Sequence, residues 1–145
     1  MRTIAVPLSL INLNDDGFHL LVEISIFNET HWAVIDTGAS RSVFDKGFIE
    51  RNSHGPVEAA SSNATTLFTT SATIQAVIPR MKIGKLTIRK YATVALDLEA
   101  VNGAYTAMGH PPVVAIIGSD IFYHYNAKIN YKKLTVYFSE DNSSG

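Results

Sequence analysis

An acidic residue at the end of an apolar strand is the feature of this sequence best suited to chemistry. The run Ala33–Ile35 leads directly into Asp36, and Thr37 and Gly38 follow at once. Burying a carboxylate is costly unless it is hydrogen-bonded or neutralised, so the strand does not need Asp36 in order to fold. A carboxylate in such a turn suits general acid or base catalysis. The structural alternative is a turn aspartate that caps its own loop.

A second motif lies well downstream, where the apolar run Val113–Ile117 ends at Gly118. Ser119 is a plausible cap for a short helix over 121–125. Asp120 falls in the first turn of that helix, where a carboxylate favours the helix dipole, so we interpret it as structural.

The two motifs together resemble those of the retropepsin-like aspartic proteases, both viral and bacterial. The resemblance rests on Asp36-Thr37-Gly38-Ala39-Ser40 followed by Ile116-Ile117-Gly118-Ser119-Asp120-Ile121-Phe122. The ending over 127–138 looks like the final hairpin of that family, and the opening hairpin with its turn at Asn28 also fits. The resemblance therefore covers most of residues 1–138.

The resemblance implies a role for each matched position. Asp36 would be the catalytic aspartate, and Thr37 would hydrogen-bond across a two-fold axis to stiffen the paired loops. Gly38 would offer backbone atoms to a bound peptide, and Ala39 and Ser40 would complete the active-site loop.

An apolar wall and a flap complete the implied site. Ile116, Ile117 and Gly118 would form the wall packed behind the Asp36 loop. The flap, a hairpin that closes over the peptide to exclude water, should lie within 59–70, a stretch that contains no glycine. Asn63 tolerates the left-handed turn conformation that a flap tip requires. The candidate flap residues are Ser62, Asn63, Ala64 and Thr65.

The chemistry of this family needs two carboxylates, one acting as base toward a water and one as acid toward the carbonyl. The chain contains one Asp-Thr-Gly, so a homodimer that supplies Asp36 twice is a requirement of the mechanism. Two like charges about 3 Å apart cannot both ionise, and the pair would share one proton. Ala39 cannot donate a hydrogen bond that stabilises the charged form of the pair, so we expect a mildly acidic optimum.

Composition excludes several other classes of protein. The formal net charge of −1 provides no electrostatic footprint for nucleic acid or an anionic membrane. The absence of cysteine excludes thiolate metal sites and cysteine nucleophiles. Ser40 and Ser42 lack the Gly-x-Ser-x-Gly elbow of serine hydrolases. The histidines show no metal-ligand spacing, so we expect neither a metal nor a cofactor; they are His19, His31, His54, His110 and His124.

The surrounding elements read mainly as strands separated by turns. Alternating apolar residues over 18–27 indicate a half-buried strand, and hairpins are expected at Gly84-Lys85 and Lys132-Lys133. The stretch 99–112 contains Gly103, Gly109 and two prolines and reads as a surface loop. The sum predicts an all-β, retropepsin-like closed barrel with one short C-terminal helix, assembled as a two-fold dimer. Residues 1–139 would be the protease domain and 140–145 a polar tail.

The leading hypothesis is therefore a homodimeric aspartic endopeptidase that cleaves extended polypeptides, in a cytoplasmic setting. One alternative is a catalytically silent retropepsin-like module that binds a peptide or partner. Another is a monomeric structural barrel. The glycine-free flap favours the silent module, whereas the intact Asp36-Thr37-Gly38 favours the enzyme.

Overall fold

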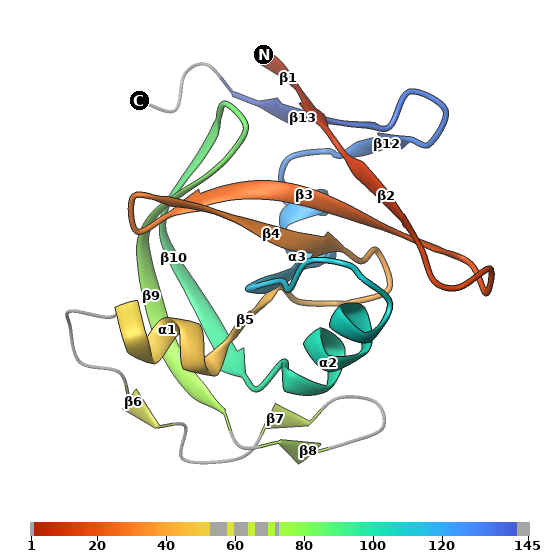
Figure 1. Ribbon diagram of the computed structural model, residues 1–145. Coiled ribbons are helices and arrows are strands. Elements are labelled where there is room, and N and C mark those ends of the chain that lie inside the picture. The colour runs from red at the N-terminus through yellow and green to blue at the C-terminus, as the bar shows by residue number, and fades with distance from the viewer. Residues whose placement is uncertain (1, 53–57, 60–63, 66–69, 72, 142–145) are drawn as a thin grey trace.

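The structure is a computed structural model that describes residues 2–52, 58–59, 64–65, 70–71 and 73–141. Its elements, shown in Figure 1, follow one another in this order: β1 (Arg2–Pro7), β2 (Ser9–Asn12), β3 (Phe18–Ile26), β4 (Glu29–Ile35), β5 (Val43–Asp45), α1 (Lys46–Asn52), β6 (Glu58–Ala59), β7 (Ala64–Thr65), β8 (Thr70–Ser71), β9 (Ile74–Ile83), β10 (Leu86–Leu96), α2 (Glu99–Ala107), β11 (Ala115–Ile117), α3 (Ser119–His124), β12 (Lys128–Asn130) and β13 (Thr135–Glu140).

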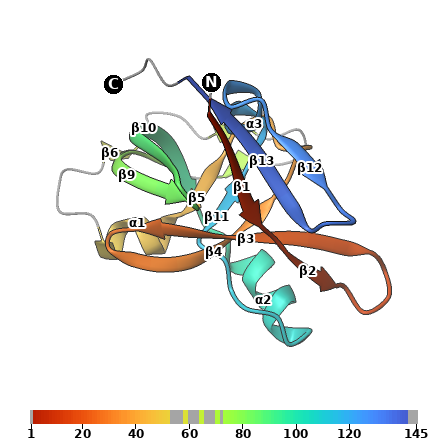
Figure 2. The same cartoon turned by 90° about the horizontal axis from the view of Figure 1, so that it is seen from above.

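Most strands join one sheet that closes on itself. Its order is β2-β3-β4-β11-β5-β10-β9-β6, and an additional pairing of β3 with β9 closes the barrel. Figure 2 shows α2 outside the barrel, and β2 pairs with β3 along its length. The all-β closed barrel expected from the sequence is confirmed.

Local sequence explains the two long hairpins. Phe27 and Asn28 both have positive φ, at 53° and 63°, which is the turn geometry that matches the twist of paired strands. The expected hairpin at Gly84-Lys85 is also present, and Gly84 has a φ of +60°. Beyond that turn β10 is one continuous strand through Tyr91.

The core has two parts. The larger cluster fills the barrel, with Phe44 and Phe138 among its fully buried side chains. A smaller cluster lies between α2 and the outside of the sheet, and its buried members are Ile11, Leu21, Val34, Tyr105 and Val113. The strand β3 contributes side chains to both clusters, because alternate residues on a strand point to opposite faces.

The expectation of a surface loop over 99–112 is wrong, because Glu99–Ala107 forms α2. Tyr105 is only 3% exposed and anchors the helix on the smaller cluster. Gly103 is tolerated within the helix, where an added Cβ would meet nothing within 4 Å. Gly109, at φ +81°, follows the helix and redirects the chain toward β11. Burial of an apolar face therefore outweighs the turn-forming composition of this segment.

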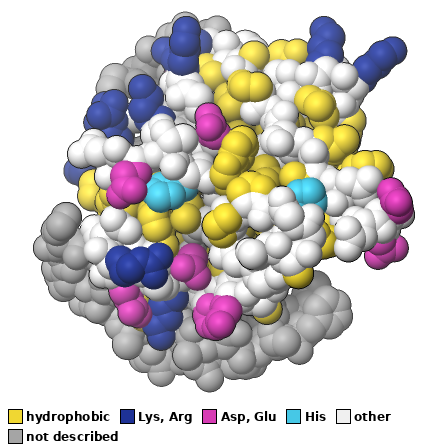
Figure 3. Space-filling model, viewed as in Figure 1, with side chains coloured by type: hydrophobic (Ala, Val, Ile, Leu, Met, Phe, Trp, Pro, Cys, Tyr) yellow, Lys and Arg dark blue, Asp and Glu magenta, His cyan; other side chains and the backbone are white. Residues whose placement is uncertain are grey.

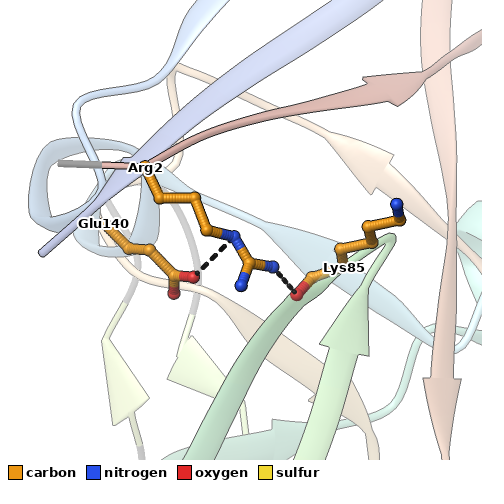
Figure 4. Close-up of polar contacts among 3 residues, drawn as sticks. All are labelled: Arg2, Lys85 and Glu140. Carbon is orange, nitrogen blue, oxygen red and sulfur yellow. Dashed lines mark hydrogen bonds and ion pairs between the residues drawn. The ribbon is translucent and has the colours of Figure 1, made fainter. Parts of the chain in front are cut away.

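A separate small sheet of order β1-β13-β12 joins the two ends of the chain. Arg2 fastens this sheet, since its guanidinium lies 3.3 Å from the Glu140 carboxylate and donates to the Lys85 carbonyl at 3.1 Å (Figure 4). The strand β13 thus extends one residue into the segment expected to be a tail. None of the helices in the described ranges is long and apolar enough to cross a membrane.

Candidate active site

The barrel places Asp36 at the point where two parallel strands end. The strands β4 and β11 pair in parallel, with Ile35 opposite Ile117. The ladder continues one step further, because the Asp36 amide donates to the Ile117 carbonyl at 2.9 Å. Ile35 and Ile117 are buried, whereas Asp36 is exposed. The chain therefore carries its aspartate out of the core at a position fixed by backbone hydrogen bonds.

The turn after Asp36 holds one oxygen of its carboxylate. The Gly38 amide donates to Asp36 Oδ1 at 2.9 Å, and the Ala39 amide donates to the Asp36 carbonyl at 3.1 Å. A Cβ added at Gly38 would lie 3.3 Å from Oδ1, so glycine permits this close approach. Oδ2 has no hydrogen-bond partner within the described part of the chain. Thr37 and Ser40 are also exposed.

Ile117 and Gly118, two of the three residues expected to form an apolar wall, contact the Asp36 loop. Ile116 and Ile117 belong to β11. Gly118 follows them and lies against the backbone of Ala39 and Arg41. A Cβ at Gly118 would lie 2.7 Å from the Ala39 carbonyl oxygen, so only glycine fits here without displacement. The Ser119 amide donates to that same oxygen at 2.8 Å. The expectation that Ser119 caps the following helix is wrong, since α3 begins at Ser119 and Gly118 is its N-cap residue.

A buried polar cluster, which was not predicted from the sequence, holds the end of the Asp36 loop in place. Ser42 is fully buried and directs both its amide (2.9 Å) and its hydroxyl (2.7 Å) to Asp120 Oδ1. The Ser42 hydroxyl in turn accepts from the Gly118 amide at 2.8 Å. Tyr91, on β10, donates its hydroxyl to Asp120 Oδ2. Asp120 thus joins α3 to the end of the Asp36 loop and to β10, a structural role larger than that of a helix-dipole residue.

The ionisation of this cluster follows from its contacts. Burial opposes the charge of Asp120, but the hydrogen bonds from Tyr91 and Ser42 outweigh it and lower the pKa of Asp120 below its ordinary value. Burial and the hydrogen bond to Asp120 raise the pKa of Tyr91 well above its usual range. Asp120 is therefore a charged acceptor and Tyr91 a neutral donor near neutral pH.

A second polar contact joins Tyr105 of α2 to His19 of β3. The Tyr105 hydroxyl lies 2.7 Å from His19 Nδ1, and the two rings meet edge to face. Burial raises the pKa of Tyr105, and the charge of Asp36 raises it further. The sequence offered no sign of Tyr105, because its segment reads as a loop.

The candidate flap is described in part. Ala64 and Thr65 form β7, which pairs antiparallel with β8 through Ala64↔Ser71 and Thr65↔Thr70. Ser62 and Asn63 lie outside the described residues. The described part of the expected flap is therefore this one short pairing, which reaches Ser71 just beyond the expected stretch. In the described ranges, no group of three or more His, Cys, Asp or Glu side chains could hold a metal ion.

The chain resembles known proteins both in sequence and in fold. The sequence matches a family model described as "Aspartyl protease" over residues 22–121. No curated protein sequence matched the chain.

Three solved structures share the fold. A retropepsin-like aspartic protease from Rickettsia conorii is 15% identical with a TM-score of 0.57, and the match covers 94% of this chain and 89% of that one. EIAV protease, complexed with the inhibitor HBY-793, is 17% identical with a TM-score of 0.57 over 83% and 99% of the two chains. The retroviral protease-like domain of Ddi1 from Leishmania major is 17% identical with a TM-score of 0.53 over 86% and 97%.

Proposed function

The chain belongs to the aspartyl protease family, and from this premise we propose that it is an aspartic endopeptidase that acts as a homodimer. The observation that carries the proposal is the Asp36 carboxylate, which is exposed, held at Oδ1 by the Gly38 amide and open at Oδ2. A group presented in this way is positioned for chemistry and contributes little to the core.

The reaction needs a second carboxylate at the same point. In the proposed dimer the second one is Asp36 of the other copy, related by a two-fold axis through the paired loops. One carboxylate removes a proton from the attacking water, while the other, protonated, donates to the carbonyl oxygen of the peptide bond. The pair shares one proton throughout, because two adjacent carboxylates resist ionising together.

The neighbouring residues have supporting roles in this proposal. Thr37, exposed in the single chain, hydrogen-bonds across the axis. Gly38 presents its backbone to the bound peptide, and Ala39 and Ser40 complete the loop. Ile116, Ile117 and Gly118 keep the loop in place from behind.

We expect cleavage to be fastest in mildly acidic solution, because the proposed pair of carboxylates shares one proton. A cleavage rate still rising below about pH 3 would contradict this expectation.

The substrate in this proposal is an extended polypeptide held under the hairpin around Ser62, Asn63, Ala64 and Thr65. The proposal takes 1–139 as the protease domain, 140–145 as a polar tail, and the cytoplasm as the location. The enzyme as proposed uses neither metal nor cofactor, since two carboxylates and a water supply every proton transfer.

The direct test is cleavage of a diverse mixture of unstructured peptides between about pH 3 and 7. Asp36→Asn removes the titrating carboxylate with little change in shape and should abolish cleavage. Asp16→Asn, at an exposed turn, makes the same chemical change away from the site and should leave cleavage unchanged. Equal cleavage by all three proteins would refute the assignment of Asp36.

One observation favours a second candidate function, a catalytically silent module that binds a peptide or partner. The stretch 59–70 contains no glycine, although a closing hairpin tip favours one. If no cleavage is found, the oligomeric state measured by light scattering distinguishes the remaining explanations. A dimer that cleaves nothing supports the binding module, and a monomer at micromolar concentration supports a structural barrel.

A further inference from the structure

The β9–β10 hairpin concentrates positive charge in a chain that is slightly acidic as a whole. Residues 80–90 include five cationic and no acidic side chains: Arg80, Lys82, Lys85, Arg89 and Lys90. Since the whole chain carries −1, subtracting these five positive charges leaves −6 on the remainder. The net charge of the whole chain therefore does not reveal the local positive charge of the hairpin.

Strand register brings three of these cations onto one surface. Arg80 lies directly opposite Arg89, and Lys82 lies opposite Thr87. The intervening residues point into the barrel and are buried; they are Met81, Ile83, Leu86 and Ile88. Arg80, Lys82 and Arg89 consequently share the outer side of the hairpin, which we call the basic face. Figure 3 shows Lys and Arg side chains gathered over this hairpin, apart from a second group at the β12–β13 turn.

The basic face is not neutralised within the chain. Like charges placed directly opposite each other on a sheet are destabilising. In the described part of the chain, no carboxylate lies within 4 Å of the hairpin's cationic groups, and the ion pairs found there are Arg2–Glu140 and His31–Glu29. The adjoining strand β3 contributes Ser25 opposite Lys82, and Glu23 lies two residues from Ser25 on the same outer side of β3. An anionic ligand on the basic face would relieve the repulsion between Arg80 and Arg89.

We propose that the basic face is a docking surface for a short, extended, acidic segment of a partner polypeptide. Arg80 and Lys82 are two residues apart on one strand, and alternate side chains on a strand are about 7 Å apart. Alternate acidic residues of an extended peptide repeat at this same distance. A nucleic acid or a membrane would extend past the hairpin and meet the net −6 of the remaining chain. The net charge therefore favours a short peptide over a long polyanion.

Such binding requires no peptide hydrolysis, so it can be measured on the 145-residue chain carrying Asp36→Asn, which cannot consume the probe through Asp36. The probe is a fluorescein-labelled peptide of roughly ten residues with alternating glutamate and serine, followed by anisotropy at about 50 mM salt. The same peptide with glutamine in place of glutamate is the neutral control. Binding should be confined to the acidic peptide and should weaken as salt is raised.

Matched variants locate the site. Arg80→Gln with Arg89→Gln removes two charges from the basic face and should raise the dissociation constant about tenfold. Lys132→Gln with Lys133→Gln removes two exposed charges from the β12–β13 turn and should change it less than about twofold. The thermal midpoint of the hairpin variant should equal or exceed that of the parent, because a like-charge pair has been removed.

Three results would overturn the proposal. The first is the absence of binding to the acidic peptide at any salt concentration. The second is an equal loss of binding in the two double variants, which would indicate attraction by overall charge. The third is displacement of the peptide by a short single-stranded DNA or by anionic vesicles that bind more tightly and depend on Arg80 and Arg89, which would assign the face to another class of partner.

Discussion

Replacement of Asp120 tests whether the candidate site is held in place from below. Three donors converge on this carboxylate: the amide and the hydroxyl of Ser42 and the hydroxyl of Tyr91. Asp120→Ala leaves all three without their acceptor. The Ser42 hydroxyl also accepts from Gly118, so its reorientation would disturb the contact between Gly118 and the Asp36 loop.

The cost can be estimated from burial. A buried donor left without a partner costs about 1–3 kcal/mol. Ser42 is fully buried and bears this cost, whereas half-buried Tyr91 can turn its hydroxyl toward water and bears only part of it. We therefore expect Asp120→Ala to lower the free energy of unfolding by about 2–4 kcal/mol. Domains of this size are commonly stable by about 5–15 kcal/mol, so the variant should still fold. Asp120→Asn keeps one oxygen acceptor for Ser42 and should cost about 1 kcal/mol.

Urea unfolding followed by fluorescence measures both variants, with Asp16→Ala as the control for loss of an exposed aspartate. The midpoint should fall at an unchanged slope, which indicates a loss of stability without a change in the surface exposed on unfolding. If peptide cleavage is established, Asp120→Ala should lower kcat more than it raises KM, because Asp120 positions the loop without touching substrate. A free energy of unfolding within about 0.5 kcal/mol of the parent would refute the reasoning, since it would mean that water replaces the lost acceptor at no cost.

Three further predictions concern contacts that glycine or ionisation makes possible. Gly84→Ala places a Cβ 2.8 Å from Val6 Cγ2 at a φ of +60°, and thermal unfolding should show a loss of about 1–3 kcal/mol. Gly118→Ala places a Cβ 2.7 Å from the Ala39 carbonyl oxygen, and we expect at least about 2 kcal/mol of destabilisation in urea together with loss of any cleavage that depends on Asp36. Because the pKa of Asp120 is lowered from 3.8, its charge stabilises the fold above that pH, and this contribution is lost as pH falls through the folded-state pKa. The stability difference between parent and Asp120→Asn in urea should therefore shrink on going from about pH 6 to below about pH 3.

The elements that the sequence predicted well are those fixed by neighbours in the chain. The β3–β4 turn at Asn28 and the β9–β10 turn at Gly84 are encoded by residues that tolerate positive φ, and alternating burial on β3 follows from alternating side chains. The helix α2 was missed because its stability comes from burial of Tyr105 against distant strands. Local composition with Gly103 gave no indication of that contact.

The residues of the candidate site likewise differ in how far they can be predicted from the sequence. Asp36 and Gly118 each follow an apolar strand directly, a pattern visible in the chain, whereas Gly38 was proposed from the resemblance of Asp36-Thr37-Gly38 to the protease family. The contact of Ser42 with Asp120 joins residues 78 positions apart. Neither residue type is distinctive where it stands, and only the three-dimensional arrangement shows that a hydroxyl and a carboxylate form one cluster.

The parallel pairing of β4 and β11 explains why the site forms at all. Ile35 and Ile117 end the two strands side by side, so the chain must turn away from the core at both points simultaneously. One turn exposes Asp36, and the other brings Gly118 against the Ala39 carbonyl, where any side chain would collide. A long-range β pairing thus determines where the carboxylate lies, and a glycine with no chemistry of its own determines how closely the loop can be supported. The candidate site therefore depends on Gly118 for the placement of the loop as well as on Asp36 for its carboxylate.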